Sequence, residues 1–104
     1  MRKTKVTFHQ EKLRVSSELM RAMAHPLRLK ILAFIDQHGT INVNKIYNTL
    51  KIEQSITSQH LRILRDAGVL LAERDGKFIH YSIDYAVVSK VERAVRNFIH
   101  NSAQ

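Results

Sequence analysis

The fold is decided by residues 44–70, which read NKIYNTLKIEQSITSQHLRILRDAGVL. Apolar residues at three- and four-residue spacing predict a first helix over Val43–Leu50 and a second over Ser55–Ala67. Gly68 is expected to end the second helix, because only glycine takes the left-handed cap conformation at low cost. Two such helices joined by a tight turn indicate a helix-turn-helix.

The polar face of the second helix carries Ser55, Ser58, Gln59, Arg62 and Arg65. Hydroxyl, amide and guanidinium groups are the side chains that contact base edges and phosphates in a DNA major groove. The alternative is an ordinary solvated face. Such faces usually mix Glu with Lys at four-residue spacing, whereas this one has a single carboxylate late in the helix. The composition favours a recognition helix.

The whole chain is basic, with 17 Lys and Arg against 9 acidic residues and a net charge of +8 over 104 residues. This surplus suggests a polyanionic partner, with nucleic acid ahead of an anionic membrane surface. The length predicts one domain, over residues 9–104, preceded by a basic tail over residues 1–8. The tail fits either a frayed terminus, which we favour, or an arm on DNA phosphates.

Cysteine is absent from the chain, which excludes disulfides and thiolate metal sites. The basic N-terminus has no apolar run behind it, so we expect neither a secretory signal nor a membrane anchor. A cytoplasmic protein is the resulting expectation.

Two helices are predicted before the helix-turn-helix, over His9–Met23 and from Pro26 to the stop at Gly39. A short extended link, Thr40–Val43, then leads to the next helix, which Asn42 can cap.

A two-stranded hairpin is predicted after Gly68, because Asp75-Gly76 is a strong turn signal between β-prone segments. Arg74 and Lys77 flank its tip. They would either contact DNA phosphates or be ordinary polar residues of a loop. A last helix is predicted over residues 85–101, capped by Asp84. Its wide apolar stripe either packs on a second copy of the chain, which we favour, or closes the monomer core.

Four segments resemble the ArsR/SmtB family of bacterial repressors. They are Ala24–Leu32 (AHPLRLKIL), Ser55–Leu64 (SITSQHLRIL), Ala67–Leu70 and Arg74–Lys77. Together they span about residues 15–100 in the family's order and spacing.

The resemblance implies a mainly α winged helix-turn-helix, with a small β-hairpin, that dimerises through its first and last helices. It implies that two recognition helices enter successive major grooves of an imperfect inverted repeat in double-stranded DNA. The family's contact positions match Gln54, Ser55, Ser58 and Gln59, and the charge pattern adds three basic residues. The predicted DNA-contacting set is therefore Gln54, Ser55, Ser58, Gln59, Arg62, Arg74 and Lys77.

Three local positions have particular expectations. Lys51 stands where the family often has Gly, so a positive φ there would be unfavourable for it. Glu53 replaces the common Ser or Thr cap, so either Ser55 caps the helix or its start frays. His60 is expected to have a structural role at the helix-turn-helix seam rather than to contact a phosphate.

The family's two usual metal sites are altered. The thiolate segment reads Asn42-Val43-Asn44, and Asn is a poor ligand for soft ions. The positions that match the second site are Asp84, Ala86, Asn97 and His100, of which two could ligate well. We therefore predict no metal and no cofactor, although a dimer could bring His9 near His100.

The leading hypothesis is a metal-independent dimeric transcriptional repressor, with any small-molecule inducer unspecified. One alternative is a ligand- or metal-responsive sensor that uses a non-standard histidine site. Another is a protein-interaction module on the same scaffold. An enzyme is least supported, because the chain has no cysteine nucleophile, glycine-rich phosphate loop or paired carboxylates in a plausible cleft.

Overall fold

The computed structural model describes residues 17–102, with side chains to residue 100. Its elements are α2 (Ser17–Met23), α3 (Pro26–His38), β1 (Thr40–Asn42), α4 (Val43–Leu50), α5 (Gln54–Asp66), β2 (Leu70–Asp75), β3 (Phe78–Ile83) and α6 (Tyr85–Ser102). This order confirms the predicted winged helix-turn-helix. The predicted tail over residues 1–8 and the first part of the predicted N-terminal helix, residues 9–16, lie outside the described residues.

Helix α3 has the bounds that Pro26 and Gly39 predict. The His25 Nδ1 atom caps it by accepting a hydrogen bond from the Leu27 N–H, at 3.1 Å. At the other end Gly39 takes a φ of 77°, and its N–H donates to the Ile35 carbonyl at 2.8 Å. The positive φ explains why this helix stops at glycine.

Helix α4 is capped as predicted, because the Asn42 Oδ1 atom accepts a hydrogen bond from the Lys45 N–H at 3.0 Å. It ends at Lys51, whose φ of 56° and ψ of 47° are left-handed, and whose N–H donates to the Tyr47 carbonyl. The glycine-like conformation expected for this turn is therefore occupied by a lysine.

The sheet has three strands instead of the predicted two. Strands β2 and β3 form the expected hairpin, with Asp75 opposite Phe78 across the tip. Strand β1 also pairs with β3, with Thr40 opposite Ser82, in the antiparallel order β1-β3-β2. The link before α4 is thus part of the sheet, because β3 offers it a free edge.

The hydrophobic core lies between the helices and one face of the sheet. The helices contribute Leu19, Ile31, Leu32, Phe34, Ile35, Ile46, Leu61, Leu64, Val91 and Ala94, and the sheet with its preceding turn contributes Ile41, Val69, Leu70, Tyr81 and Ile83. All of these side chains are buried. This packing fixes the positions of α4, α5 and the hairpin relative to one another.

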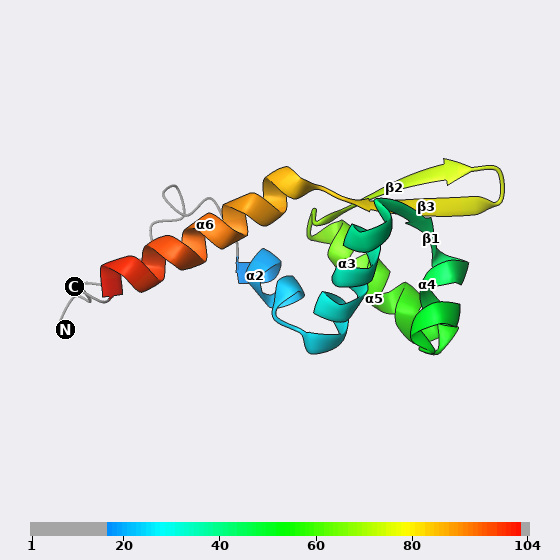
Figure 1. The fold of residues 1–104 in the computed structure, drawn as a ribbon, viewed down its shortest axis with the longest axis horizontal. Helices are drawn as coiled ribbons and strands as arrows, with labels where there is room; N and C mark the ends of the chain where they lie inside the picture. The colour runs from blue at the N-terminus through cyan, green and yellow to red at the C-terminus, as the bar shows by residue number, and fades with distance from the viewer. Residues whose placement is uncertain (1–16, 103–104) are drawn as a thin grey trace.

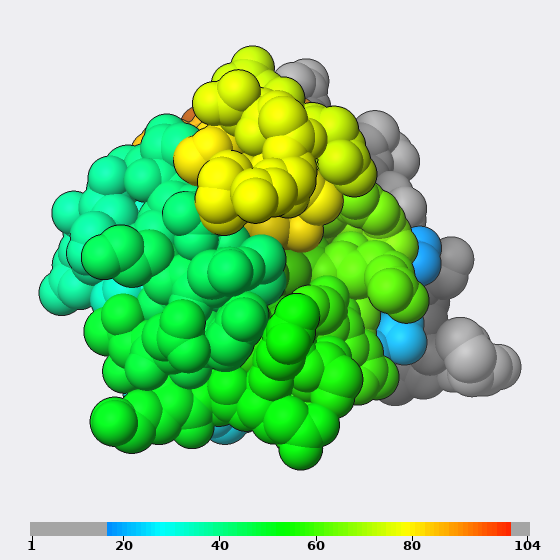
Figure 2. Space-filling view, turned by 90° about the vertical axis from the view of Figure 1, so that its right-hand side faces the viewer, coloured from blue at the N-terminus to red at the C-terminus, as the bar shows by residue number. Residues whose placement is uncertain are grey.

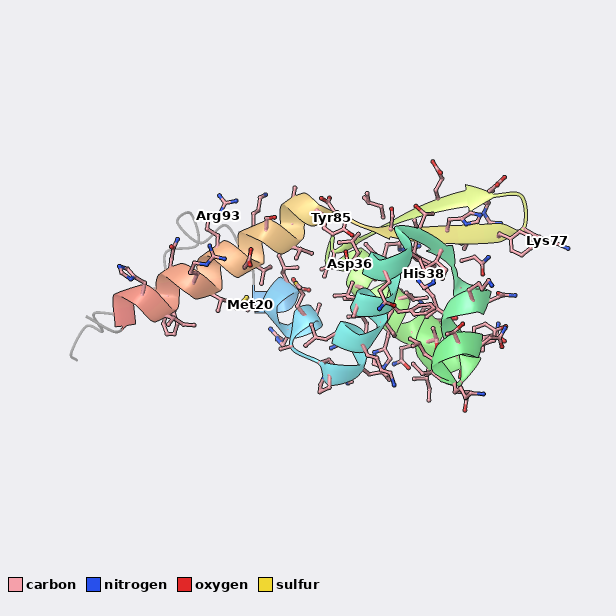
Figure 3. The ribbon with its side chains drawn as sticks, viewed as in Figure 1. Met20, Asp36, His38, Lys77, Tyr85 and Arg93 are labelled. Atoms are coloured by element: carbon pink, nitrogen blue, oxygen red, sulfur yellow. The ribbon has the colours of Figure 1, made fainter. Side chains whose placement is uncertain are left out.

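The molecule is elongated, with extents of 54 × 23 × 22 Å. Helix α6 projects at one end of it and the hairpin lies at the other (Figure 1). Asp84 caps α6 as predicted, with its Oδ1 atom accepting from the Ala86 N–H at 3.2 Å. The Tyr85 hydroxyl donates to Asp36 of α3 at 2.5 Å; both side chains are labelled in Figure 3. Val95 and Ile99, farther along the helix, are 38% and 60% exposed.

Candidate nucleic-acid interface

The candidate interface is built on α5, whose inner face is fixed in the core. Thr57, Leu61 and Leu64 are each 0% exposed. The Thr57 hydroxyl donates to the Glu53 carbonyl at 3.0 Å, which satisfies a buried polar group. A helix anchored along one face in this way presents the opposite face in a defined direction.

The opposite face of α5 carries the predicted contact residues. Gln54, Ser55, Gln59 and Arg62 are exposed, and Ser58 is half-buried. In the end-on view of Figure 2, the green surface of α4 and of the start of α5 lies below the yellow tip of the hairpin. The start of the helix and the wing therefore share one end of the molecule.

The start of α5 differs from both predicted alternatives. The helix begins at Gln54, one residue earlier than expected, and Glu53 occupies the cap position without a side-chain cap bond. Ser55 does not cap the helix, because its hydroxyl donates to the Glu53 carboxylate. A DNA contact by Ser55 would therefore have to compete with this bond.

The wing holds the other two predicted residues, both of them exposed. The Arg74 Nη1 atom donates to the Gly76 carbonyl at 3.5 Å. The Lys77 ammonium lies 5.9 Å from the centre of the Phe78 ring, and Figure 3 shows it at the tip of the hairpin. Both residues belong to the hairpin, which lies at the end of the molecule that carries the start of α5.

His60 is half-buried, and it contacts α3 and the residue that caps α3, whereas its structural role was expected at the seam between α4 and α5. Its ring centre is 4.9 Å from that of His25, and its Nδ1 atom is 3.2 Å from the Arg28 Nη1 atom. Burial lowers the pKa of His60 below its ordinary 6.5, and the nearby His25 and Arg28 lower it further.

Sequence reasoning missed two features of this site. Ile56 belongs to the apolar flank of α5, yet its side chain is 40% exposed. Arg28 belongs to a segment that resembles the family, but its link to α5 has no local signal in the sequence because its partner is 32 residues away.

The altered metal positions have other roles. Asn42 caps α4 and Asp84 caps α6. Within residues 17–102, no three His, Cys, Asp or Glu side chains gather closely enough to hold a metal ion.

Comparison with known proteins identifies the family. A profile of the arsR family of bacterial regulatory proteins matches residues 25–70. The transcriptional repressor PagR of Bacillus anthracis is 46% identical over 68 residues, which make up 65% of this chain and 68% of PagR. The chain belongs to the ArsR family. An uncharacterized HTH-type transcriptional regulator of Methanocaldococcus jannaschii is 34% identical over 83% of this chain and 93% of that protein.

Solved structures of ArsR-family proteins have the same fold. The crystal structure of PagR matches with a TM-score of 0.68 at 39% identity, covering 81% of this chain and 97% of PagR. That of Rv0081 from Mycobacterium tuberculosis matches with a TM-score of 0.64 at 32% identity, covering 93% and 98%. The family resemblance predicted from the sequence is confirmed.

Membership of the ArsR family makes the chain a DNA-binding transcriptional regulator rather than an enzyme, as the sequence predicted. In the part of the chain that the structure describes, no helix combines the length and apolarity needed to cross a bilayer.

Proposed function

We propose that this ArsR-family protein is a cytoplasmic, dimeric repressor that reads an imperfect inverted repeat without a metal, and that residues 9–104 form its single domain. Helix α5 enters the major groove and the wing contacts the backbone. The proposed contacts are Gln54, Ser55, Ser58, Gln59, Arg62, Arg74 and Lys77. The observation that carries this proposal is the outward face of α5, which presents hydroxyl, amide and guanidinium groups on a helix fixed by its buried face.

The dimer is supported by the apolar surface of α6. Val95 and Ile99 are exposed one turn apart on a helix that projects from the body (Figure 1). Met20 of α2 is 39% exposed and is labelled below α6 in Figure 3. Exposed apolar residues gathered on two helices are typical of an interface between copies of a chain.

Sedimentation equilibrium tests the dimer with the variant Ile99→Glu. We expect the variant to be monomeric at concentrations where the wild type is dimeric, because a carboxylate would be buried in the interface. Leu71→Glu is the matched control, since Leu71 is 52% exposed and belongs to β2, opposite Ser82, rather than to α6. If the Ile99→Glu variant remained dimeric, the proposal that α6 forms the dimer interface would be wrong.

DNA reading is tested by fluorescence anisotropy with a duplex selected from random-sequence DNA, against a scrambled duplex. Gln59→Ala should lower the ratio of specific to non-specific affinity about tenfold, a loss of about 1–3 kcal/mol that is typical of a base contact. Lys77→Ala should weaken binding to both duplexes about equally, because a phosphate contact carries no sequence information.

The exposed residues Gln37 of α3 and Lys90 of α6 provide matched controls. Gln37→Ala and Lys90→Ala should leave both affinities near the wild-type values. An unchanged ratio in Gln59→Ala would contradict the proposed recognition face.

A further inference from the structure

A single guanidinium joins three helices behind the recognition helix. From α3, the Arg28 Nε atom donates to the Ala22 carbonyl at 2.7 Å and Nη2 donates to the Arg21 carbonyl at 3.4 Å. Both carbonyls lie in the last turn of α2. The remaining terminal nitrogen, Nη1, reaches the His60 Nδ1 atom of α5 at 3.2 Å. Arg28 thus links the end of α2 to the middle of α5.

This geometry determines where the proton of His60 lies. An arginine can only donate hydrogen bonds, so the His60 Nδ1 atom must accept, and the ring is neutral with its proton on Nε2. The neighbouring His25 is constrained in the same way, because its Nδ1 atom accepts from the Leu27 N–H at 3.1 Å. Protonation of either ring at Nδ1 would remove a hydrogen bond.

The position of His60 on α5 connects this bond to DNA reading. Successive helix residues are turned by about 100°, so His60 lies on the flank between the buried side and the outward face that carries Gln59. The buried residues hold the helix from one side, and the Arg28 bond holds the flank. Losing the bond would leave the rotation of α5 about its own axis less well defined.

We propose that Arg28 is a positioning residue for the recognition helix, and that it acts only on neutral His60, so that acidification weakens sequence-specific DNA binding. The inference rests on the proposed function, since it requires that α5 reads DNA.

Other charges surround this cluster. A cleft of about 430 Å³ beside Arg28 is also lined by Glu18 and Arg21 of α2 and by Asp66 of α5. Burial lowers the pKa of His60, and the charges of His25 and Arg28 beside it lower that pKa further. A pKa below the ordinary value means that neutral His60 stabilises the fold at neutral pH, and this stabilisation is lost as pH falls through that pKa.

Two variants and one control distinguish the positioning of α5 by Arg28 from a general effect of positive charge on DNA binding. His60→Asn places an amide oxygen near the position of Nδ1, where it can accept from Arg28 but cannot titrate. Arg28→Lys keeps the charge but has one nitrogen where three are needed. His38→Asn is the control, because His38 lies at the other end of α3, outside the cluster, and its Nδ1 atom contacts the Phe34 carbonyl.

The measurement is the ratio of affinities for the selected and scrambled duplexes, at constant ionic strength, between about pH 7.5 and about pH 5.5. Taking the ratio cancels the non-specific gain that extra positive charge gives to both duplexes. We expect the wild-type ratio to fall as the pH approaches the pKa of His60, toward a limit of about tenfold when the ring is fully protonated, the size of losing one hydrogen bond to a charged group. His38→Asn should behave like the wild type.

His60→Asn should keep the neutral-pH ratio within about threefold and lose its pH dependence, whereas Arg28→Lys should lower the ratio about tenfold at neutral pH. Nitrogen-15 NMR of the DNA-free wild type should find Nδ1 of His60 unprotonated at neutral pH, with a midpoint below the ordinary value. This readout needs neither DNA nor a variant that folds.

Three results would overturn the proposal. They are a proton on Nδ1 at neutral pH, a wild-type ratio that is flat or rises on acidification, and an unchanged pH dependence in His60→Asn. A rising ratio would indicate that protonated His60 itself contributes to sequence-specific binding. If no duplex is preferred at any pH, the proposed function itself fails, whereas a preferred duplex with a flat ratio removes only this inference.

Discussion

Replacing Lys51 by glycine should stabilise the protein, although the change removes a whole side chain. Lys51 is exposed and has a φ of 56° at the end of α4. A left-handed conformation costs a non-glycine residue about 1–2 kcal/mol. The greater conformational freedom of glycine in the unfolded chain lowers the stability of the variant by about 0.4–1 kcal/mol. We therefore expect Lys51→Gly to raise the free energy of unfolding by about 0.5–1 kcal/mol.

Urea unfolding followed by circular dichroism measures this difference. The protein concentration must be held constant, because the stability of a dimer depends on it. With slopes of about 1–3 kcal/mol per molar urea, the midpoint should rise by a few tenths of a molar.

Lys45→Gly is the matched control, since it makes the same chemical change at the other end of α4. Lys45 is also exposed but lies in the first turn of α4, where glycine should lower stability by up to about 1 kcal/mol. If both variants moved the midpoint in the same direction, relief of backbone strain at Lys51 would be refuted.

Three further outcomes are expected. Asn42→Ala should lower the free energy of unfolding by about 1 kcal/mol through loss of the α4 cap, while Asn48→Ala on the same helix should change it little. DNA affinity measured by anisotropy should fall on the order of a thousandfold or more between roughly 50 and 200 mM salt, if each subunit neutralises about three to five phosphates. The hydrogen bond to Asp36 raises the pKa of Tyr85 above its ordinary 10.0. Phenolate absorbance should therefore show a late ionisation in the wild type that moves to lower pH in Asp36→Asn. Because the folded pKa is raised, the stability contributed by this bond is present below the ordinary value and lost as pH rises through the shifted one.

The helix-turn-helix and the wing were predictable from sequence because their signals are local. Asn42 caps α4 through a residue three positions away. The Asp75-Gly76 signal marks the tip of the hairpin, where the two turn residues are Gly76, at a φ of 65°, and Lys77. Helix α5 begins and ends within one residue of its predicted bounds.

The unpredicted features depend on contacts between distant parts of the chain. Strand β1 exists because Thr40 pairs with Ser82, and a three-residue segment carries no pattern that identifies its partner. The link from Arg28 to His60 likewise joins helices that only the folded chain brings together. The polar Thr57 is fully buried because its hydroxyl finds a carbonyl one helical turn back, a choice that hydrophobic periodicity cannot detect.

Because α6 projects at one end of the molecule, a small rotation at that end moves the other end by a larger distance. In the proposed dimer the partner is held at one end of a molecule that is 54 Å long, while the surface that reads DNA lies at the other. A swing of about 4° at the held end would carry the far end by roughly 4 Å, close to the ~3.4 Å spacing between successive base pairs. A displacement too small to disturb the core could therefore shift the reading surface by one step along the groove.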